Sequence, residues 1–359
     1  MSSARLTVSL DALAANYATF AQAARVDATA TGTGRRCGAV VKADGYGLGL
    51  SAVAQCLAKA GCGDFFVATM EEGVALREAL GMTRIYVFSG VTDAANAGLA
   101  AASNLVPVLN HAGQLDLWRA HRDRPMALHV DTGMQRLGWD ADGADADTFS
   151  RFDVQLLMTH LACADTPDHP LNQRQVDLFA AVSARFPGVP TSIGNSAGTL
   201  NGDAFQGDLC RPGIGLYGGN PYADRANPMR PVATFEGQIL QVRNVKRGAT
   251  LGYGATYTAT RDSVVAVVGA GYADGVPRLL SNQGEVALHG QRCPVIGRVS
   301  MDAVHVDVSG VDAVMPGDWV EFFGAAIGVD EVAECAQTIS YEVLTGLGAR
   351  TERRYDPPA

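Results

Sequence analysis

Short apolar runs alternate with helical stretches along the first 212 residues of the chain. The helical stretches, such as 11–24, 71–80 and 173–186, space their apolar residues three or four apart, and Asp11 is the expected N-cap of the first. Strands that alternate with helices form parallel sheets, and about eight of them favour a closed barrel over an open doubly wound sheet. The runs that we read as strands cover residues 40–42, 65–68, 85–88, 105–109, 127–130, 155–158, 190–193 and 209–212. We therefore predict an α/β fold built on a parallel (β/α)8 TIM-type barrel.

The pattern changes near residue 220, where Pro221, Pro228 and Pro231 mark a linker. Beyond Thr234 the chain is rich in apolar and β-branched runs separated by glycine, which is typical of antiparallel sheet. These runs cover residues 237–242, 264–268, 284–288, 304–308 and 319–323, followed by short predicted helices at 330–336 and 340–346. We place the barrel at 10–228 and a mostly antiparallel β-domain at 229–359. A first strand at about 1–9 is a candidate member of the β-domain.

The composition is that of an ordinary globular protein, and its charge excludes several kinds of partner. Asp and Glu outnumber Lys and Arg by 37 to 28, which gives a net charge of −9. This negative charge does not favour binding to nucleic acid. Seven cysteines without a CxxC pair, and histidines without an HxxxH pair, support neither a disulfide framework nor a metal site. No export signal and no membrane-spanning apolar run is visible. We expect a cytoplasmic protein with reduced thiols.

One predicted strand ends on a charged residue. The run 38–41 leads into Lys42, and glycines at 45, 47 and 49 supply the permissive backbone of a tight loop. Burial favours a neutral amine, which can form a Schiff base or take a proton. The alternative is a lysine whose amine reaches out of the strand end into water. Barrel chemistry gathers at the carboxyl ends of the strands, where the polar residues are Lys42, Asp131, Arg136, His160, Asn195, Ser196 and Arg211.

A glycine-rich run follows the last predicted strand of the barrel. Residues 213–218 match the dinucleotide pattern GxGxxG, but Asn220 and Pro221 come where that pattern needs a helix. A dinucleotide site is therefore disfavoured. The backbone N–H groups of such a run can still cradle a phosphate at the eighth strand of a barrel.

Nine sequence blocks, in order along nearly the whole chain, carry a resemblance to one family. They are AVVKADGYG at 39–47, DTGMQRLG at 131–138, THL at 159–161, NSA at 195–197, RPGIG at 211–215, GYGATY at 252–257, GYADG at 271–275, GRVSMD at 297–302 and ISYE at 339–342. Together they closely resemble the bacterial alanine racemase family. One block alone would be a weak signal, whereas nine in register are a specific one.

The resemblance implies an enzyme that uses pyridoxal 5′-phosphate, and a homodimer whose subunits share their active sites. Lys42 would hold the cofactor covalently, Arg211 would face its pyridine nitrogen, and His160 would support its ring. Arg136 would bond the cofactor's phenolic oxygen and help to bind the substrate. The phosphate would be held by Tyr46, Ser196, Tyr341 and the amides of Gly213 and Ile214, and Asn195 belongs to the same cofactor-binding set.

Racemisation requires a proton to leave one face of the substrate Cα and another to arrive on the opposite face, which two bases do most simply. The resemblance implies that Lys42 and Tyr272 of the partner subunit form this pair, with Met301 and Asp302 of the partner subunit completing the substrate pocket. The unperturbed pKa of tyrosine is near 10, so a tyrosine base needs cationic neighbours. Arg211 donates without giving up its proton. The ring nitrogen then stays unprotonated, which favours racemisation over transamination.

The expected activity is the reversible conversion of L-alanine into D-alanine, which supplies peptidoglycan precursors. A racemase of broader specificity, acting for example on serine or lysine, is the alternative, because the sequence does not give the width of the pocket. A decarboxylase with the same barrel and cofactor is disfavoured, because such enzymes place a carboxylate at the ring nitrogen, where this chain has Arg211. A vitamin B6 carrier built on a barrel alone is disfavoured by the β-domain that carries Tyr272 and Met301.

The chain departs from the family pattern two residues before Asp131. Well-known members carry a carbamylated lysine there, whose negative charge orients the arginine that matches Arg136. This chain has His129 instead, which carries no negative charge. Because an unpaired buried guanidinium costs roughly 3–5 kcal/mol, we expect a small anion such as chloride, or a chain of water molecules, beside Arg136, with His129 donating to it. The alternative is that His129 bonds a backbone carbonyl and a carboxylate such as Asp131 orients Arg136.

Overall fold

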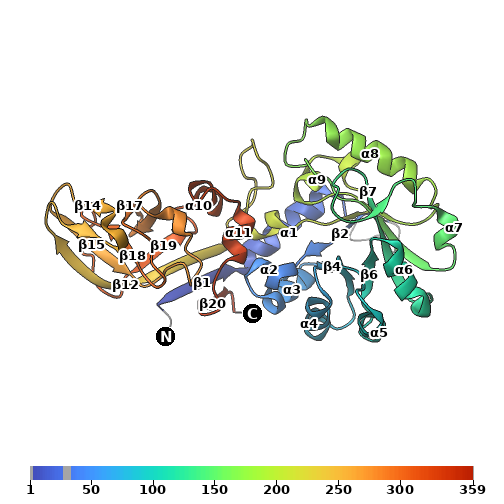
Figure 1. Cartoon of the computed structure of the whole chain (residues 1–359), viewed down its shortest axis with the longest axis horizontal. Coiled ribbons are helices and arrows are strands. Elements are labelled where there is room, and N and C mark those ends of the chain that lie inside the picture. The colour runs from blue at the N-terminus through green and yellow to red at the C-terminus, as the bar shows by residue number, and fades with distance from the viewer. Residues whose placement is uncertain (1–2, 27–33, 359) are drawn as a thin grey trace.

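The computed structural model describes residues 3–26 and 34–358. The molecule is elongated, with a barrel of strands and helices at one end and a β-rich part at the other (Figure 1). Strand β1 (Ala4–Ser9) and strand β12 (Ala233–Val245) belong to the β-rich part, and helix α1 (Leu10–Ala23) follows β1 into the barrel. Apolar side chains of both parts pack into one contiguous core.

The barrel is a ring of parallel strands. The sheet follows the order β10-β9-β7-β6-β5-β4-β3, and the ring closes because β11 pairs in parallel with β2 and Gly207 bridges to Ser192 in β10. The strands are β2 (Arg36–Cys37), β3 (Ala39–Val40), β4 (Asp64–Val67), β5 (Arg84–Val87), β6 (Val106–Leu109), β7 (Pro125–Asp131), β9 (Asp153–Met158), β10 (Thr191–Ser192) and β11 (Leu209–Cys210), with β8 (Trp139–Asp140) on the side of β7. The predicted parallel barrel is confirmed.

Helices connect the successive strands of the ring (Figure 1). They are α3 (Leu50–Lys59), α4 (Met70–Leu80), α5 (Ala94–Ala102), α6 (Ala112–Trp118), α7 (Ala146–Phe149), α8 (Pro170–Ser183) and α9 (Ser196–Leu200), together with the short turn α2 (Lys42–Tyr46) after β3. The predicted helices at 71–80 and 173–186 overlap α4 and α8. The prediction of Asp11 as an N-cap is wrong. Ser9 has the extended backbone of a cap and its hydroxyl accepts from Ala12 N, which leaves Asp11 in the first turn.

The β-domain is a closed antiparallel sheet. Its strands follow the order β15-β18-β17-β16-β19-β12, and β12 also pairs with β15. They are β12, β15 (Ser263–Val268), β16 (Glu285–Leu288), β17 (Gln291–Ile296), β18 (Val304–Asp307) and β19 (Trp319–Phe323), with a small hairpin of β13 (Thr250–Leu251) and β14 (Tyr257–Thr258). Helices α10 (Val329–Cys335) and α11 (Ser340–Thr345) follow. The predicted antiparallel domain is confirmed, although β17 was not predicted.

The two ends of the chain extend this sheet. Strand β1 pairs antiparallel with β12, and the last strand, β20 (Glu352–Asp356), pairs in parallel with β1. The C-terminal segment also contacts the barrel, because Arg353 Nε donates to Gly47 O at 3.0 Å and the Tyr355 hydroxyl donates to Leu48 O at 3.1 Å. The β-domain therefore holds the glycine loop that follows Lys42. No helix in the described ranges is long and apolar enough to cross a membrane.

Candidate active site

A cavity of about 460 Å³ opens where the barrel strands end, a volume within the usual range for small-molecule sites. Every residue that the resemblance assigned to the cofactor lines it, namely Lys42, Tyr46, Arg136, His160, Asn195, Ser196, Arg211, Gly213, Ile214 and Tyr341. His129 also lines the cavity. The further lining residues, to which the resemblance assigned no role, are Val40, Ala68, Phe88, Ser89, Leu137 and Met158. Residues that lie up to 299 positions apart, from Lys42 to Tyr341, thus converge on one cavity.

The backbone after Lys42 makes a left-handed turn. Ala43, Asp44 and Tyr46 have φ values of 53°, 55° and 56°, a region that side chains other than glycine seldom adopt. The predicted strand that runs into Lys42 therefore ends earlier, at Val40, and Lys42 begins the turn. This strained backbone persists only where the surrounding structure holds it.

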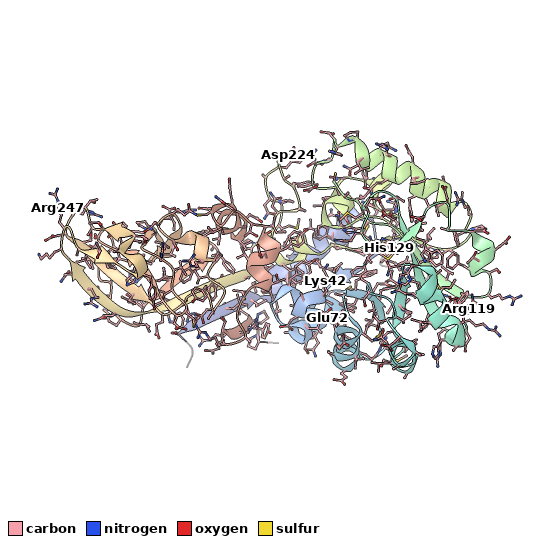
Figure 2. All side chains as sticks on the ribbon, viewed as in Figure 1. Lys42, Glu72, Arg119, His129, Asp224 and Arg247 are labelled. Carbon is pink, nitrogen blue, oxygen red and sulfur yellow. The ribbon has the colours of Figure 1, made fainter. Side chains whose placement is uncertain are left out.

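Glu72 holds the start of that turn from a neighbouring helix. Its carboxylate accepts from Ala43 N at 2.6 Å and from Ala68 N at 2.8 Å, and it also forms the capping box of α4 with Thr69. Figure 2 shows Lys42 and Glu72 in the half of the barrel that faces the β-domain. We did not predict this capping box, although the pattern Thr-x-x-Glu is its sequence signature; no sequence pattern indicates the contact with Ala43.

The environment of Lys42 lowers the pKa of its amine, chiefly through burial and then through the positive charge of Arg136, although Glu72 opposes this. The Phe88 ring centroid lies 6.0 Å from Nζ. A lowered pKa increases the fraction of neutral amine at neutral pH, and the neutral amine is the form that reacts with carbonyl groups and takes protons.

Hydroxyl groups gather at the end of the cavity next to residues 213–215. Ser196 Oγ accepts from Gly213 N at 2.9 Å and from Gly215 N at 3.3 Å, so its hydroxyl proton is available to donate into the cavity. A Cβ at position 213 would lie 2.4 Å from the Tyr46 hydroxyl oxygen, so only glycine permits this approach. Asn195 caps helix α9, because its Oδ1 accepts from Gly198 N at 2.9 Å.

Two tyrosines at the same end are uncharged donors. The ring of Tyr46 stacks on that of Tyr217 with centroids 4.3 Å apart, and the ring of Tyr341 lies 5.9 Å away. Burial raises the pKa of Tyr46 well above its usual value and that of Tyr341 to about 12. Both hydroxyls keep their protons at neutral pH, and an oxyanion is the ligand that such donors favour.

Arg211 is a buried cation at the floor of the cavity, with a guanidinium that donates only to neutral oxygen atoms in the described structure. These are Thr159 O at 2.6 Å, Ile193 O at 3.3 Å and the Ser192 hydroxyl. Burial lowers the pKa of Arg211 to about 10, so the side chain remains charged at neutral pH. Burial and the nearby Arg211 charge also lower the pKa of His160 to about 3, so its imidazole is neutral.

His129 bonds a side-chain amide, so the alternative in which it bonds a backbone carbonyl is wrong. His129 Nδ1 lies 2.8 Å from Asn110 Oδ1, while Asn110 Nδ2 donates to Val108 O at 2.9 Å and to Phe88 O at 3.1 Å. These two bonds fix the amide orientation of Asn110, so its oxygen accepts and Nδ1 of His129 carries the proton. Burial and the nearby Arg211 charge lower the pKa of His129 to about 4. Its Nε2 is therefore an unprotonated acceptor, which differs from the expected donor.

Asp131 does not orient Arg136, so this expectation is also wrong. The Asp131 carboxylate accepts from the backbone N–H groups of Gly133, Met134 and Gln135 at 2.8, 2.8 and 2.9 Å and so closes its own loop. Within residues 3–26 and 34–358 no carboxylate forms an ion pair with Arg136. A small anion beside Arg136 stays a prediction. The positive charge of Arg136 would attract this anion, whereas His129 Nε2 has no proton to donate to it.

The residues assigned to the partner subunit lie outside the cavity of their own chain. Tyr272 and Met301 are 45% and 52% exposed, on adjacent loops of the β-domain where Tyr272 N donates to Ser300 O at 3.0 Å. Asp302 follows Met301 on the same loop and is also exposed. None of these three side chains lines the cavity that holds Lys42.

Bromide can replace chloride and scatters anomalously, so it tests the anion prediction directly. We expect an anomalous peak within bonding distance of the Arg136 guanidinium in bromide-soaked crystals, because that cation has no carboxylate partner in the described structure. A map without a peak there, in crystals that show ordered bromide elsewhere, would contradict the prediction.

Comparison with known proteins agrees with this geometry. The family model "Alanine racemase, N-terminal domain" matches residues 8–221, and the model "Alanine racemase, C-terminal domain" matches residues 232–355. The chain is 47% identical to an alanine racemase of Rhodospirillum rubrum, over 98% of this chain and 96% of that protein. It superposes with a TM-score of 0.91 and 35% identity on the crystal structure of alanine racemase from Bartonella henselae with covalently bound pyridoxal phosphate, covering 98% and 99% of the two chains. Biosynthetic alanine racemase from Pseudomonas aeruginosa superposes with a TM-score of 0.90 and 35% identity, covering 99% of each chain. The chain therefore belongs to the alanine racemase family.

Proposed function

We propose that the protein interconverts L-alanine and D-alanine with pyridoxal 5′-phosphate bound in the barrel cavity, and so supplies D-alanine for peptidoglycan. The observation that carries this proposal is the convergence of Lys42, the hydroxyl donors and Arg211 on one cavity. Membership of the alanine racemase family supports the reaction type. The free thiols of all seven cysteines support a reducing compartment, and we place the enzyme in the cytoplasm.

The residues of the cavity fit the cofactor. Lys42 offers an amine with a lowered pKa for covalent attachment. The Ser196 oxygen already accepts two backbone bonds, so its hydroxyl proton is free to donate to the phosphate. Arg211 suits the ring nitrogen, His160 the ring and Arg136 the phenolic oxygen. The phosphate would be held by Tyr46, Ser196, Tyr341 and the backbone of Gly213 and Ile214, with Asn195 fixing the helix that carries Ser196. When bound, the cofactor supplies an electron sink that makes the substrate Cα proton acidic.

The protein's own residues then decide where protons go. Lys42 Nζ would take or give a proton on one face of the substrate, and Tyr272 Oη of the partner subunit would serve the other face. Arg211 donates a hydrogen bond without releasing its proton, because its pKa of about 10 lies well above neutrality. A decarboxylase is disfavoured because such enzymes place a carboxylate at the ring nitrogen, whereas this cavity offers Arg211 and no Asp or Glu among the described residues that line it.

We further propose a homodimer that shares its active sites, with the barrel at 10–228 and the β-domain at 229–359 as the two building blocks of each subunit. Tyr272 and Met301 are exposed and lie outside their own cavity. In a two-fold dimer whose elongated subunits lie antiparallel, the β-domain loops of each subunit would meet the barrel of the other. Substrate contacts by Arg136 and by the partner subunit's Met301 and Asp302 follow from the same arrangement.

Substrate choice is the first property to test. Purified protein with the cofactor should invert alanine faster than serine or lysine when products are separated by chiral chromatography. Comparable rates for all three would favour the broader racemase. Carbon dioxide release in place of inversion would contradict the proposed function.

The shared site predicts complementation between two inactive variants. Lys42→Ala removes one base and Tyr272→Phe removes the other, so each homodimer should have little racemase activity. After random exchange of subunits, half of the dimers are mixed and one of their two sites holds both bases, so up to about a quarter of all sites should recover. Exchange can be verified by mass with differently tagged chains. Verified exchange without recovered activity would count against a shared site.

A further inference from the structure

We propose that Arg350 is a positioning residue that fixes the two loops carrying Tyr272 and Met301, and so sets the place of the second base. The proposal rests on the proposed function, because it takes Tyr272 to be that base. The loops are 271–275, called here the tyrosine loop, and 300–302, called the methionine loop. Arg350 belongs to neither and precedes strand β20.

The guanidinium of Arg350 joins the two loops. Its Nε donates to Asp274 Oδ1 at 2.7 Å, and one terminal nitrogen donates to Asp274 Oδ2 at 2.9 Å. The same nitrogen contacts Asp302 Oδ1 at 2.7 Å and Met301 O at 3.4 Å. One side chain therefore forms a two-pronged bond to the tyrosine loop and a bond to Asp302 of the methionine loop, with Met301 O in a longer contact.

Asp274 makes this joint rigid. Its carboxylate is buried and its Oδ2 also accepts from Gly271 N at 2.8 Å, which closes the turn that presents Tyr272. Its carbonyl oxygen accepts from Gly348 N at 3.0 Å and from the Thr351 hydroxyl at 3.3 Å. A buried carboxylate is stable only with a counterion and satisfied hydrogen bonds, and Arg350 is that counterion.

The backbones of the two loops are in direct contact beneath the ion pair. Tyr272 N donates to Ser300 O at 3.0 Å, and Ala273 N donates to Met301 O at 3.1 Å. A Cβ at Gly271 would lie 2.3 Å from both Ser300 O and Met301 O, so the loops cannot approach this closely with another residue there. A change in one loop must therefore displace the other, and Arg350 restrains both.

Lysine cannot replace arginine at such a joint. Its ammonium keeps the charge but lacks the planar fork that bonds both oxygens of Asp274 while reaching Asp302. A displacement of a catalytic group by about 1 Å can cost on the order of 100-fold in rate. Arg350→Lys is therefore expected to leave the fold in place and to displace Tyr272.

Arg292 is a matched control within the same domain. It forms a forked bond to Glu331, a contact of 3.3 Å with Glu285 and a bond to Ala326 O at 3.0 Å, with a side chain 44% exposed against 49% for Arg350. None of the atoms it bonds belongs to the tyrosine or methionine loop. Arg292→Lys thus removes an equivalent two-pronged bond, and it changes no contact of the tyrosine loop or the methionine loop.

The test compares holoenzyme variants in D₂O with each alanine enantiomer. Lys42 can remove a Cα proton and return deuterium to the same face, whereas inversion needs both bases. For Arg350→Lys we expect the rate of inversion to fall by roughly 10–100-fold. With the enantiomer that Lys42 deprotonates, deuterium uptake that retains the configuration should therefore increase relative to inversion. Arg292→Lys should keep the wild-type ratio. Cofactor absorbance and thermal midpoint should be similar in the two lysine variants.

A second variant keeps the proposal testable if lysine disturbs the fold. Arg350→Ala should regain inversion when millimolar guanidinium is added, since the free ion can restore the fork, and methylammonium should not have this effect. An unchanged ratio in Arg350→Lys, equal losses in the two lysine variants, or Arg350→Ala without rescue would overturn the role of Arg350. A wild-type enzyme that neither inverts alanine nor exchanges its Cα proton would instead overturn the proposed function.

Discussion

The anchoring of the strained turn after Lys42 is the constraint on which the site depends. The turn places three residues other than glycine in the left-handed region, at a cost of order 1–2 kcal/mol for each. Glu72 holds it from helix α4 in the barrel, and the C-terminal segment holds the following loop through Arg353 and Tyr355. The amine thus depends on contacts from the barrel and from the C-terminal strand, and removal of the last strand would release its loop.

The side chains that line the cavity determine its charge. Lys42, Arg136 and Arg211 are cationic side chains of its wall, whereas His129 and His160 are held neutral by burial and by those cations. Such a wall favours an anionic ligand and lowers the pKa of the amine that must react. Arg211 bonds only neutral oxygen atoms in the described structure, so these partners do not neutralise its charge. That charge therefore attracts an anionic group in the cavity.

The sequence predicted the elements that rest on local patterns and missed those that rest on tertiary contacts. Apolar runs predicted the barrel strands, because parallel strands are buried on both faces. Strand β20 was missed because its residues, ERRYD, are mostly charged, and it forms only by pairing with β1. Strand β17 was not predicted because its first two residues are polar and Pro294 interrupts its apolar pattern.

The candidate site shows the same division. The motifs of the resemblance located the cofactor-binding residues that line the cavity, but they could not reveal what those residues bond. His129 contacts Asn110 from another strand end, and Asp131 closes its own loop, so neither partner follows from spacing. Arg350 was not predicted as a site residue, since its ion pair with Asp274 joins positions 76 residues apart.

The central claim is that Lys42 is the reacting amine of this cavity. Borohydride reduction of the holoenzyme fixes the cofactor to the lysine that holds it, and peptide mapping identifies that residue. The chain offers two other lysines for comparison, Lys59 and Lys246, and both are exposed. The account predicts a single modified peptide that contains Lys42, and a modification on Lys59 or Lys246 would contradict it.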